Sequence, residues 1–210
     1  MKLYDADRAP SPRRVRIYLA EKAISVERVT VDLRAGEHLQ PAFLAINPRG
    51  TVPALRLDDG EVIGDSTAIC RFFEALHPDP PLFGARPVEI ARVTAWTRRV
   101  EAEGYAAAVY ALRNIAAGFA GRAEAGQWPR LEQIPALAER GRVMWAHFVA
   151  TLDARLGESE WLAGDRFSFA DITAFVTVDF ARAAKLTVGE DAANLRRWYD
   201  AMGARPSAAA

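Results

Sequence analysis

The chain has 210 residues, half of them hydrophobic, and its 27 lysine and arginine residues balance 27 aspartate and glutamate residues. This length suits one large domain or two small ones, and the hydrophobic share is enough for a substantial core. Zero net charge argues against nucleic acid or an anionic membrane as the main partner.

The single cysteine, Cys70, excludes an intramolecular disulfide and a Cys-based zinc site, and we expect no bound metal. It lies in an apolar periodic run, so we interpret it as a packing residue. No apolar run approaches the roughly 20 residues of a membrane-spanning helix, and no secretory signal follows Met1. We therefore expect a cytoplasmic protein with no membrane partner.

Residues 1–77 are predicted to form an α/β domain. Ser11-Pro12 has the form of an N-cap followed by proline at the first helical position. Asp59-Gly60, between two β-rich runs, predicts a hairpin with a type I′ turn, and Ser66 is the predicted N-cap of the next helix. The predicted elements are a strand at 3–4, a helix at 12–23, a strand at 27–31, a short helix within 36–46, strands at 54–57 and 61–63, and a helix at 66–76.

The rest of the chain is predicted to be entirely helical. His77-Pro78-Asp79-Pro80-Pro81 disfavours both helix and central strand, so we place an interdomain linker at 78–86. Ser168-Phe169-Ala170-Asp171 predicts a capping box at the start of a buried helix. The predicted elements of the second domain, 87–210, are a helix at 87–118 with a kink near Gly104, a loop at 121–135, and helices at 135–156, 168–184 and 192–202.

Four motifs follow one another along the chain: Val52-Pro53, Asp65-Ser66, Gly164-Asp165-x-x-Ser168-x-Ala170-Asp171, and Trp198-x-x-x-Met202-x-x-Arg205-Pro206-Ser207. Together they resemble the cytosolic glutathione transferase family over essentially the whole chain. The resemblance implies a thioredoxin-like first domain, an all-helical second domain and glutathione as co-substrate. The sequence Ala-Pro-Ser-Pro-Arg-Arg-Val-Arg at 9–16 is similar to the start of an atypical bacterial and fungal theta-like branch.

Glutathione is a tripeptide with an ammonium group, two carboxylates and a thiol. The resemblance implies a cis bond before Pro53, which exposes the backbone of Val52 for pairing with the cysteinyl part of the ligand. It also implies that Ser66 and its helix N-terminus bind the γ-glutamyl carboxylate, that Asp65 binds the ammonium, and that His38 binds the glycyl carboxylate. The structural alternatives are a plain N-cap for Ser66, a solvated loop acid for Asp65 and a surface histidine for His38. The predicted glutathione-binding residues are His38, Thr51, Val52, Pro53, Asp65 and Ser66.

The thiol of glutathione needs activation, because a thiol with a pKa of about 8.5 is only a few per cent thiolate at pH 7. The predicted devices are the hydroxyl of Ser11 and the N-terminus of the helix that begins at Pro12. Ser11 would therefore act by stabilising the thiolate. The alternatives are the hydroxyl of Tyr4 and a water held by the helical domain.

Three parts of the chain depart from the family's pattern. On an alignment anchored at Arg14-Val15-Arg16, the serine of the serine-type classes falls at Ala9 and not at Ser11. Thr51 stands where the theta-like branch carries a lysine. Arg113-Asn114-Ile115-Ala116-Ala117 lacks the histidine and the proline that relatives show in this helix, which weakens the water alternative.

Tyr105, Tyr110 and Arg113 are the predicted lining of a second-substrate pocket, with core packing as the alternative for the tyrosines. We predict a homodimeric detoxification enzyme that joins the glutathione thiolate to a small, largely hydrophobic electrophile. The alternatives are a glutathione-dependent disulfide reductase or peroxidase on the same fold, and a non-catalytic glutathione-binding or assembly module.

Overall fold

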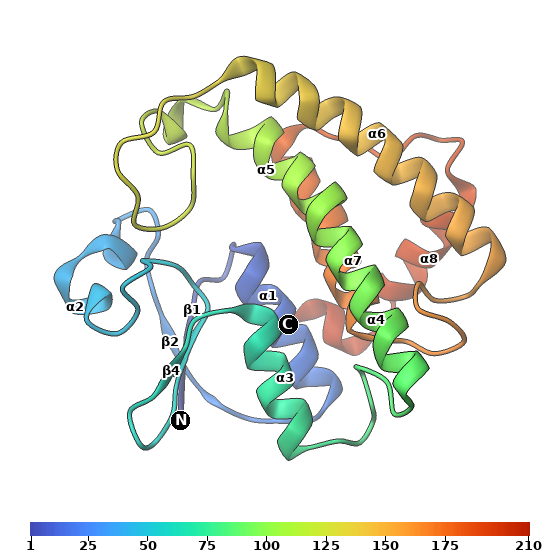
Figure 1. Ribbon diagram of the computed structural model, residues 1–210, viewed down its shortest axis with the longest axis horizontal. Helices are drawn as coiled ribbons and strands as arrows, with labels where there is room; N and C mark the ends of the chain where they lie inside the picture. The colour runs from blue at the N-terminus through green and yellow to red at the C-terminus, as the bar shows by residue number, and fades with distance from the viewer. The chain divides into compact units, whose positions relative to one another are not determined.

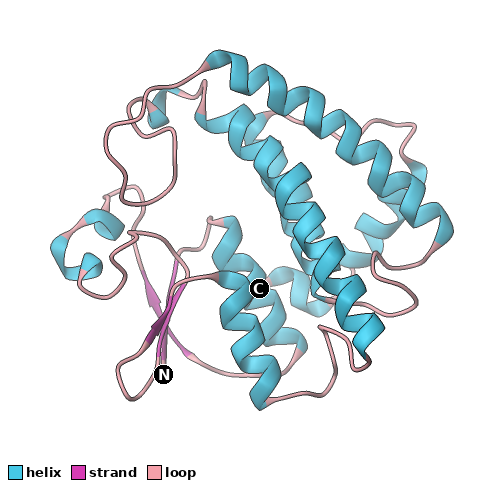
Figure 2. Ribbon diagram, in the orientation of Figure 1, coloured by secondary structure: helices cyan, strands magenta, loops and turns pink.

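Two compact units make up the chain, and the computed structural model describes residues 1–210. The first unit contains residues 1–80, 124–130 and 210, and the second contains 81–123 and 131–209. Every strand lies in the first unit, whereas the second consists of helices and loops (Figure 2). The stretch 124–130 thus packs with the first unit, although in the sequence it falls between two helices of the second unit. The sequence does not predict this arrangement.

A four-stranded mixed sheet forms the centre of the first unit. Its strands lie in the order β2-β1-β3-β4. They are β1 (Lys2–Asp5), β2 (Glu27–Thr30), β3 (Ala54–Arg56) and β4 (Val62–Ile63). The parallel pair β1–β2 needs a crossover, which helix α1 (Pro10–Glu21) supplies, whereas the antiparallel pair β3–β4 is joined directly by a hairpin. The predicted order of elements and the thioredoxin-like first domain are confirmed.

Helices pack on the two faces of this sheet. α1 and α3 (Ser66–Leu76) lie side by side (Figure 1). On the other face, Phe43 of the short helix α2 (Pro41–Leu44) meets the ring of Tyr4 edge-on, with 5.9 Å between ring centroids. The ring of Tyr4 thus takes part in packing α2 against the sheet. The buried core of the unit includes Leu3, Val15, Ile17, Leu55, Ile69 and Phe73.

Both predicted serine N-caps are wrong by one or two residues. α1 begins at Pro10 with Ala9 as its N-cap, so Ser11 lies inside the first turn. Proline suits the first helical position because that position needs no N–H. At α3 the N-cap is Asp65, which accepts the N–H of Ala68 at 2.9 Å, and Ser66 is the first helical residue. Aspartate and serine are comparably good caps, so their adjacency leaves the choice to the fold.

The hairpin between β3 and β4 has a three-residue loop, and the predicted type I′ turn is wrong. The N–H of Leu57 donates to the carbonyl oxygen of Glu61 at 2.8 Å, and the N–H of Gly60 donates to that of Leu57 at 3.1 Å. Gly60 has a φ of +95°, but Asp59 does not have the positive φ that a type I′ turn requires. The carboxylate of Asp59 instead accepts the N–H of Glu61 at 3.0 Å, which stabilises the longer loop.

Five α-helices make up most of the second unit. They are α4 (Pro87–Arg99), α5 (Ala106–Arg113), α6 (Pro135–Glu158), α7 (Phe169–Ala181) and α8 (Ala193–Gly203). The helix predicted over 87–118 ends at Arg113 and is interrupted by a π-helical stretch, Val100–Tyr105. Gly104 belongs to this stretch, and a Cβ there would lie 2.3 Å from the ring of Phe148 on α6. The irregularity expected near Gly104 therefore has a packing cause. None of the helices combines the length and the apolar character that crossing a membrane requires.

The predicted capping box at the start of α7 is confirmed. The buried carboxylate of Asp171 accepts the backbone N–H groups of Leu162 and Ser168, both at 3.0 Å. It also accepts the hydroxyl of Ser168 at 2.8 Å and the indole N–H of Trp198 on α8 at 3.1 Å. Burial raises the pKa of Asp171 to about 6, although all of these donors favour its charged form. One carboxylate therefore ties α7 to α8.

Candidate active site

The peptide bond between Val52 and Pro53 is cis, as expected. Pro53 is buried, and Val52 lies two residues before β3 begins. The first residue of β3, Ala54, pairs with Tyr4 of β1, and the pairing goes no further toward Val52. Neither the N–H nor the C=O of Val52 bonds to another backbone group. An extended peptide can therefore pair with Val52 as an added strand.

The turn before Val52, residues 47–51, is held by the buried side chain of Asn47. Its Nδ2 donates to the carbonyl oxygen of Thr51 at 2.7 Å and to the Thr51 hydroxyl at 3.2 Å. A Cβ on Gly64 would lie 3.3 Å from the same amide group, so Asn47 also packs against the approach to α3. In the sequence Asn47 indicated only the end of a short helix. Its role in joining the two halves of the site was missed.

The N-terminus of α3 presents an acid and backbone donors together. One oxygen of Asp65, Oδ1, accepts the N–H of Ala68, and Oδ2 has no partner in the chain. The N–H of Ser66 has no acceptor in the chain, as is usual in the first turn of a helix. A carboxylate is favoured at this N–H and by the helix dipole, whereas a cation is favoured at Asp65. This end of the site can therefore hold a group that carries both charges.

His38 lies in the 3₁₀ turn Glu37–Leu39, which packs against the turn 47–51. A Cβ at Gly50 would lie 3.1 Å from the carbonyl oxygen of His38 and 3.0 Å from a methyl group of Leu39. The half-buried His38 therefore flanks the turn that carries Thr51 and leads into Val52. The segments that carry His38 and Thr51, which are separated in the sequence, are thus in contact.

The N-terminus of α1 offers few hydrogen-bond donors. Pro10 and Pro12 have no N–H, and the N–H of Arg13 donates to the carbonyl oxygen of Ala9 at 3.3 Å. Ser11 therefore supplies the one available N–H of the first turn, and its hydroxyl makes no hydrogen bond within the chain. An anion at this end of α1 would meet the Ser11 amide, the Ser11 hydroxyl and the helix dipole together.

The loop that leads into α1 is held by ion pairs that the sequence did not reveal. The carboxylate of Asp5 is buried and lies 2.7 Å from Arg16 and 2.6 Å from Arg28. The guanidinium of Arg16 also donates to the carbonyl oxygen of Asp7 at 2.9 Å. Burying a carboxylate is costly unless it is paired or hydrogen-bonded, and the two arginines meet this need at Asp5. Arg16 thereby ties the middle of α1 to the loop before its own N-terminus.

The two tyrosines predicted to line a second-substrate pocket, Tyr105 and Tyr110, lie on consecutive helical segments of the second unit. Tyr105 ends the π-helical stretch, and its ring packs on Phe180 with 5.4 Å between centroids. Tyr110 lies on α5 and is half-buried. The contact of Tyr105 with Phe180 accounts for part of its surface by packing alone.

Arg113, predicted beside the second substrate, binds the chain that follows α5. Its Nε donates to the carbonyl oxygen of Ala123 at 3.1 Å, and its Nη2 donates to that of Arg122 at 2.7 Å. Its guanidinium also lies 4.4 Å from the ring centroid of Phe119. These contacts give Arg113 a positioning role in addition to any contact with a substrate.

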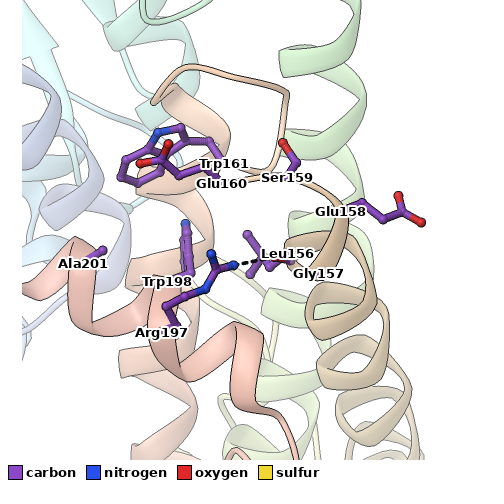
Figure 3. Close-up of a pocket in the computed structure, with 9 residues that line it drawn as sticks. All are labelled: Leu156, Gly157, Glu158, Ser159, Glu160, Trp161, Arg197, Trp198 and Ala201. Carbon is purple, nitrogen blue, oxygen red and sulfur yellow. Dashed lines mark hydrogen bonds between the residues drawn. The ribbon is translucent and has the colours of Figure 1, made fainter.

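A cavity of about 460 Å³ lies in the second unit, between the C-terminal end of α6 and α8 (Figure 3). Trp161 and Trp198 form part of its wall, and Arg197 donates to the carbonyl oxygen of Leu156 (Figure 3). None of the predicted site residues lines this cavity. The candidate site is therefore the group of elements around the turn 47–51 in the first unit.

Two family models match the chain. Residues 9–76 match the N-terminal domain of glutathione S-transferase, and residues 132–206 match its C-terminal domain. Glutathione S-transferase 2 of Saccharomyces cerevisiae is 39% identical over 211 residues, which cover 99% of this chain and 87% of the relative. Maleylacetoacetate isomerase of Pseudomonas aeruginosa is 34% identical over 218 residues, which cover 99% of this chain and 93% of that protein.

A solved structure extends the similarity to the fold. The crystal structure of Gtt2 from Saccharomyces cerevisiae matches with a TM-score of 0.90 at 38% sequence identity, covering 99% of this chain and 98% of the other. The similarity thus spans both units, and the N-terminal match includes the turn 47–51 and the start of α3. The chain belongs to the glutathione S-transferase family and is a glutathione transferase.

Proposed function

We propose that this enzyme binds glutathione, stabilises its thiolate and transfers it to small, largely hydrophobic electrophiles. The observation that carries the proposal is the unpaired backbone of Val52, joined through Asn47 to the open helix start at Asp65 and Ser66. A peptide ligand with charged ends matches this combination. Detoxification of reactive electrophiles is the physiological role that such chemistry serves.

Each part of glutathione has a complementary group. The cysteinyl part pairs with the backbone of Val52, as one more strand beyond β3. The γ-glutamyl carboxylate binds at the N–H of Ser66, and the neighbouring ammonium binds Oδ2 of Asp65. His38 and the adjoining Thr51 receive the glycyl carboxylate.

Ser11 is the proposed thiolate stabiliser. It supplies both donors of the first turn of α1, because Pro10 and Pro12 have no N–H. Hydrogen bonding to the anionic form lowers the pKa of a thiol and so raises the thiolate fraction at neutral pH. Arg16 keeps the preceding loop in position through Asp5.

Glutathione binding by isothermal titration calorimetry tests the first part of this proposal. Absence of both heat of binding and thermal stabilisation at millimolar glutathione would contradict it. Turnover of a chloronitrobenzene compared with turnover of hydroxyethyl disulfide then separates conjugation from disulfide reduction. Binding without turnover of either compound would favour the non-catalytic module.

A second candidate function is the glutathione-dependent isomerisation of maleylacetoacetate. It is favoured by the 34% identity to the Pseudomonas aeruginosa protein of that name, over nearly the whole of both chains. Isomerisation returns glutathione unchanged, whereas conjugation consumes it. Measuring glutathione alongside the loss of maleylacetoacetate therefore distinguishes the two functions.

We further propose that the enzyme acts as a cytoplasmic homodimer, as the family resemblance implies. Size-exclusion chromatography with light scattering tests the assembly. The expected mass is twice the 23.0 kDa of one chain. Tyr105, Tyr110 and Arg113 are the proposed lining of the second-substrate pocket.

A further inference from the structure

The segment between α5 and α6 packs against the turn that precedes the cis-proline. The N–H of Gln127 donates to the carbonyl oxygen of Arg49 at 2.7 Å. Gly126 has a φ of +93°, and a Cβ there would lie 2.4 Å from the same carbonyl oxygen and 2.7 Å from Cγ2 of Thr51. Only glycine permits this approach. Residues 124–130 are called the latch below.

The turn is held from two sides. Gly50, with a φ of +60°, packs so closely that its Cβ position lies 3.2 Å from the N–H nitrogen of Gln127. The same position lies 3.1 Å from the carbonyl oxygen of His38. The turn therefore lies between the latch and the 3₁₀ turn that carries His38.

Hydrogen bonds close the base of the latch. The N–H of Ala123 donates to the carbonyl oxygen of Leu131 at 3.2 Å, and the N–H of Leu131 donates to that of Gly121 at 3.1 Å. Arg113 donates to two further carbonyl oxygens at this base, those of Arg122 and Ala123. The chain segments that enter and leave the latch are therefore hydrogen-bonded to each other, and these bonds hold the two ends of the latch together.

Apolar burial does not explain why the latch lies where it does. Every latch residue except Gly126 is exposed, and Trp128 is 61% exposed. The indole N–H of Trp128 donates within the latch, to the carbonyl oxygen of Ala125 at 3.0 Å. Exposed side chains gain little from the hydrophobic effect. The close contacts of the latch are instead with the turn, at the backbone of Arg49 and the methyl group of Thr51.

We propose that the latch holds the turn 47–51 in the conformation that presents the Val52 backbone to glutathione. This proposal rests on the glutathione binding proposed above. Gly126 and Gln127 are then positioning residues, because they fix the Arg49 carbonyl and the adjoining chain without touching the ligand. A turn released from the latch has to be ordered again when glutathione binds. That ordering weakens binding, whereas the core of the first unit keeps its packing.

The first test compares Gly126→Ala with Gly60→Ala. Both glycines have nearly the same φ, +93° and +95°, but no atom lies within 4 Å of a Cβ at Gly60. The two substitutions therefore share the backbone strain, and only one displaces the latch. Gly126→Ala should raise the Kd for glutathione about fivefold or more, with Gly60→Ala within about twofold of the wild type, because only the former loses preorganisation. An unchanged Kd in Gly126→Ala overturns the proposal.

The second test removes one donor. Gln127→Pro deletes the N–H that reaches Arg49, whereas Gln127→Ala keeps that N–H and shortens an exposed side chain. The proline variant should bind glutathione more weakly, the alanine variant should bind like the wild type, and kcat at saturating glutathione should be the same in both. A lower Tm without a change in Kd assigns the latch a purely structural role and overturns the proposal. Failure of the wild-type protein to bind glutathione removes the proposed function as well, so the two failures are distinguishable.

Discussion

Nδ2 of Asn47 donates to the carbonyl oxygen of Thr51 at 2.7 Å, and this bond closes the turn that leads into the cis-proline. The same amide group packs against Gly64, directly before the N-cap of α3. One buried side chain therefore sets the position of the Val52 edge relative to the helix start at Asp65. Those are the two features that have to match the two ends of one ligand.

Asn47→Asp should weaken glutathione binding about tenfold and lower the free energy of unfolding by about 1–3 kcal/mol, because a buried donor is lost and a charge is introduced. Asparagine and aspartate have nearly the same shape, so packing changes little. Calorimetric titration and urea unfolding measure the two effects. An unchanged Kd together with lower stability would show that Asn47 supports the fold without positioning the site.

Asp65→Asn separates capping from ligand binding at α3. Asparagine is about as good an N-cap as aspartate, so unfolding should change by less than about 0.5 kcal/mol, whereas Asp65→Ala should lose about 1 kcal/mol. The Kd for glutathione should rise about tenfold in both variants, because the ammonium loses its carboxylate. Normal binding by Asp65→Asn would leave Asp65 as a cap alone.

Ser11→Ala should lower kcat/KM about 10- to 100-fold by removing a donor to the thiolate, while the Kd for glutathione stays within about twofold. The apparent pKa of bound glutathione should rise, which the pH dependence of its thiolate absorbance measures. Tyr4→Phe is the matched removal of the alternative hydroxyl, and we expect no change from it because its ring packs on Phe43. The reverse pattern would assign the thiolate to Tyr4.

The stability contributed by Asp171 should depend on pH. Burial raises its pKa from the ordinary 3.8 to about 6 in the folded protein, so the folded state holds the proton more tightly than the unfolded state. Its contribution is then fully present below about pH 4 and is lost as the pH rises through about 6.

Urea unfolding of the wild type and Asp171→Asn between pH 4.5 and 7 measures this dependence. The stability advantage of the wild type should shrink by on the order of 2 kcal/mol as the pH rises through this range. A constant or growing advantage would mean that the donors from Leu162, Ser168 and Trp198 outweigh burial and keep Asp171 charged.

Arg113→Lys keeps the positive charge but loses the planar group that reaches the carbonyl oxygens of Arg122 and Ala123 together. Amide exchange over residues 122–131 should become faster by about tenfold, because roughly 1.4 kcal/mol of local stability is lost with the two guanidinium hydrogen bonds. The KM for the electrophile should stay the same if Arg113 acts only on this chain segment. A raised KM with unchanged exchange would instead support the predicted contact with the second substrate.

The sequence by itself determined the features that depend on residues close together in the chain. The cis bond before Pro53 is implied by the family resemblance. The capping box of Ser168 and Asp171 and the alternation of strands and helices, by contrast, are features of this local kind. Local hydrogen bonding and side-chain periodicity decide them, so they follow from spacing. The placement of Val52, Asp65 and Ser66 at one end of the first unit follows from the same order of elements.

Tertiary structure decided the features that join distant segments. The ion pairs of Asp5, the packing of Asn47 against Gly64, and the contact of Gly126 with Arg49 depend on the folded paths of separate segments. The contact between 126 and 49 crosses from one half of the sequence to the other, and no local periodicity encodes it. Close packing selects such contacts only once the sheet and helices have formed, because the backbone distance that requires glycine at 126 does not exist before then.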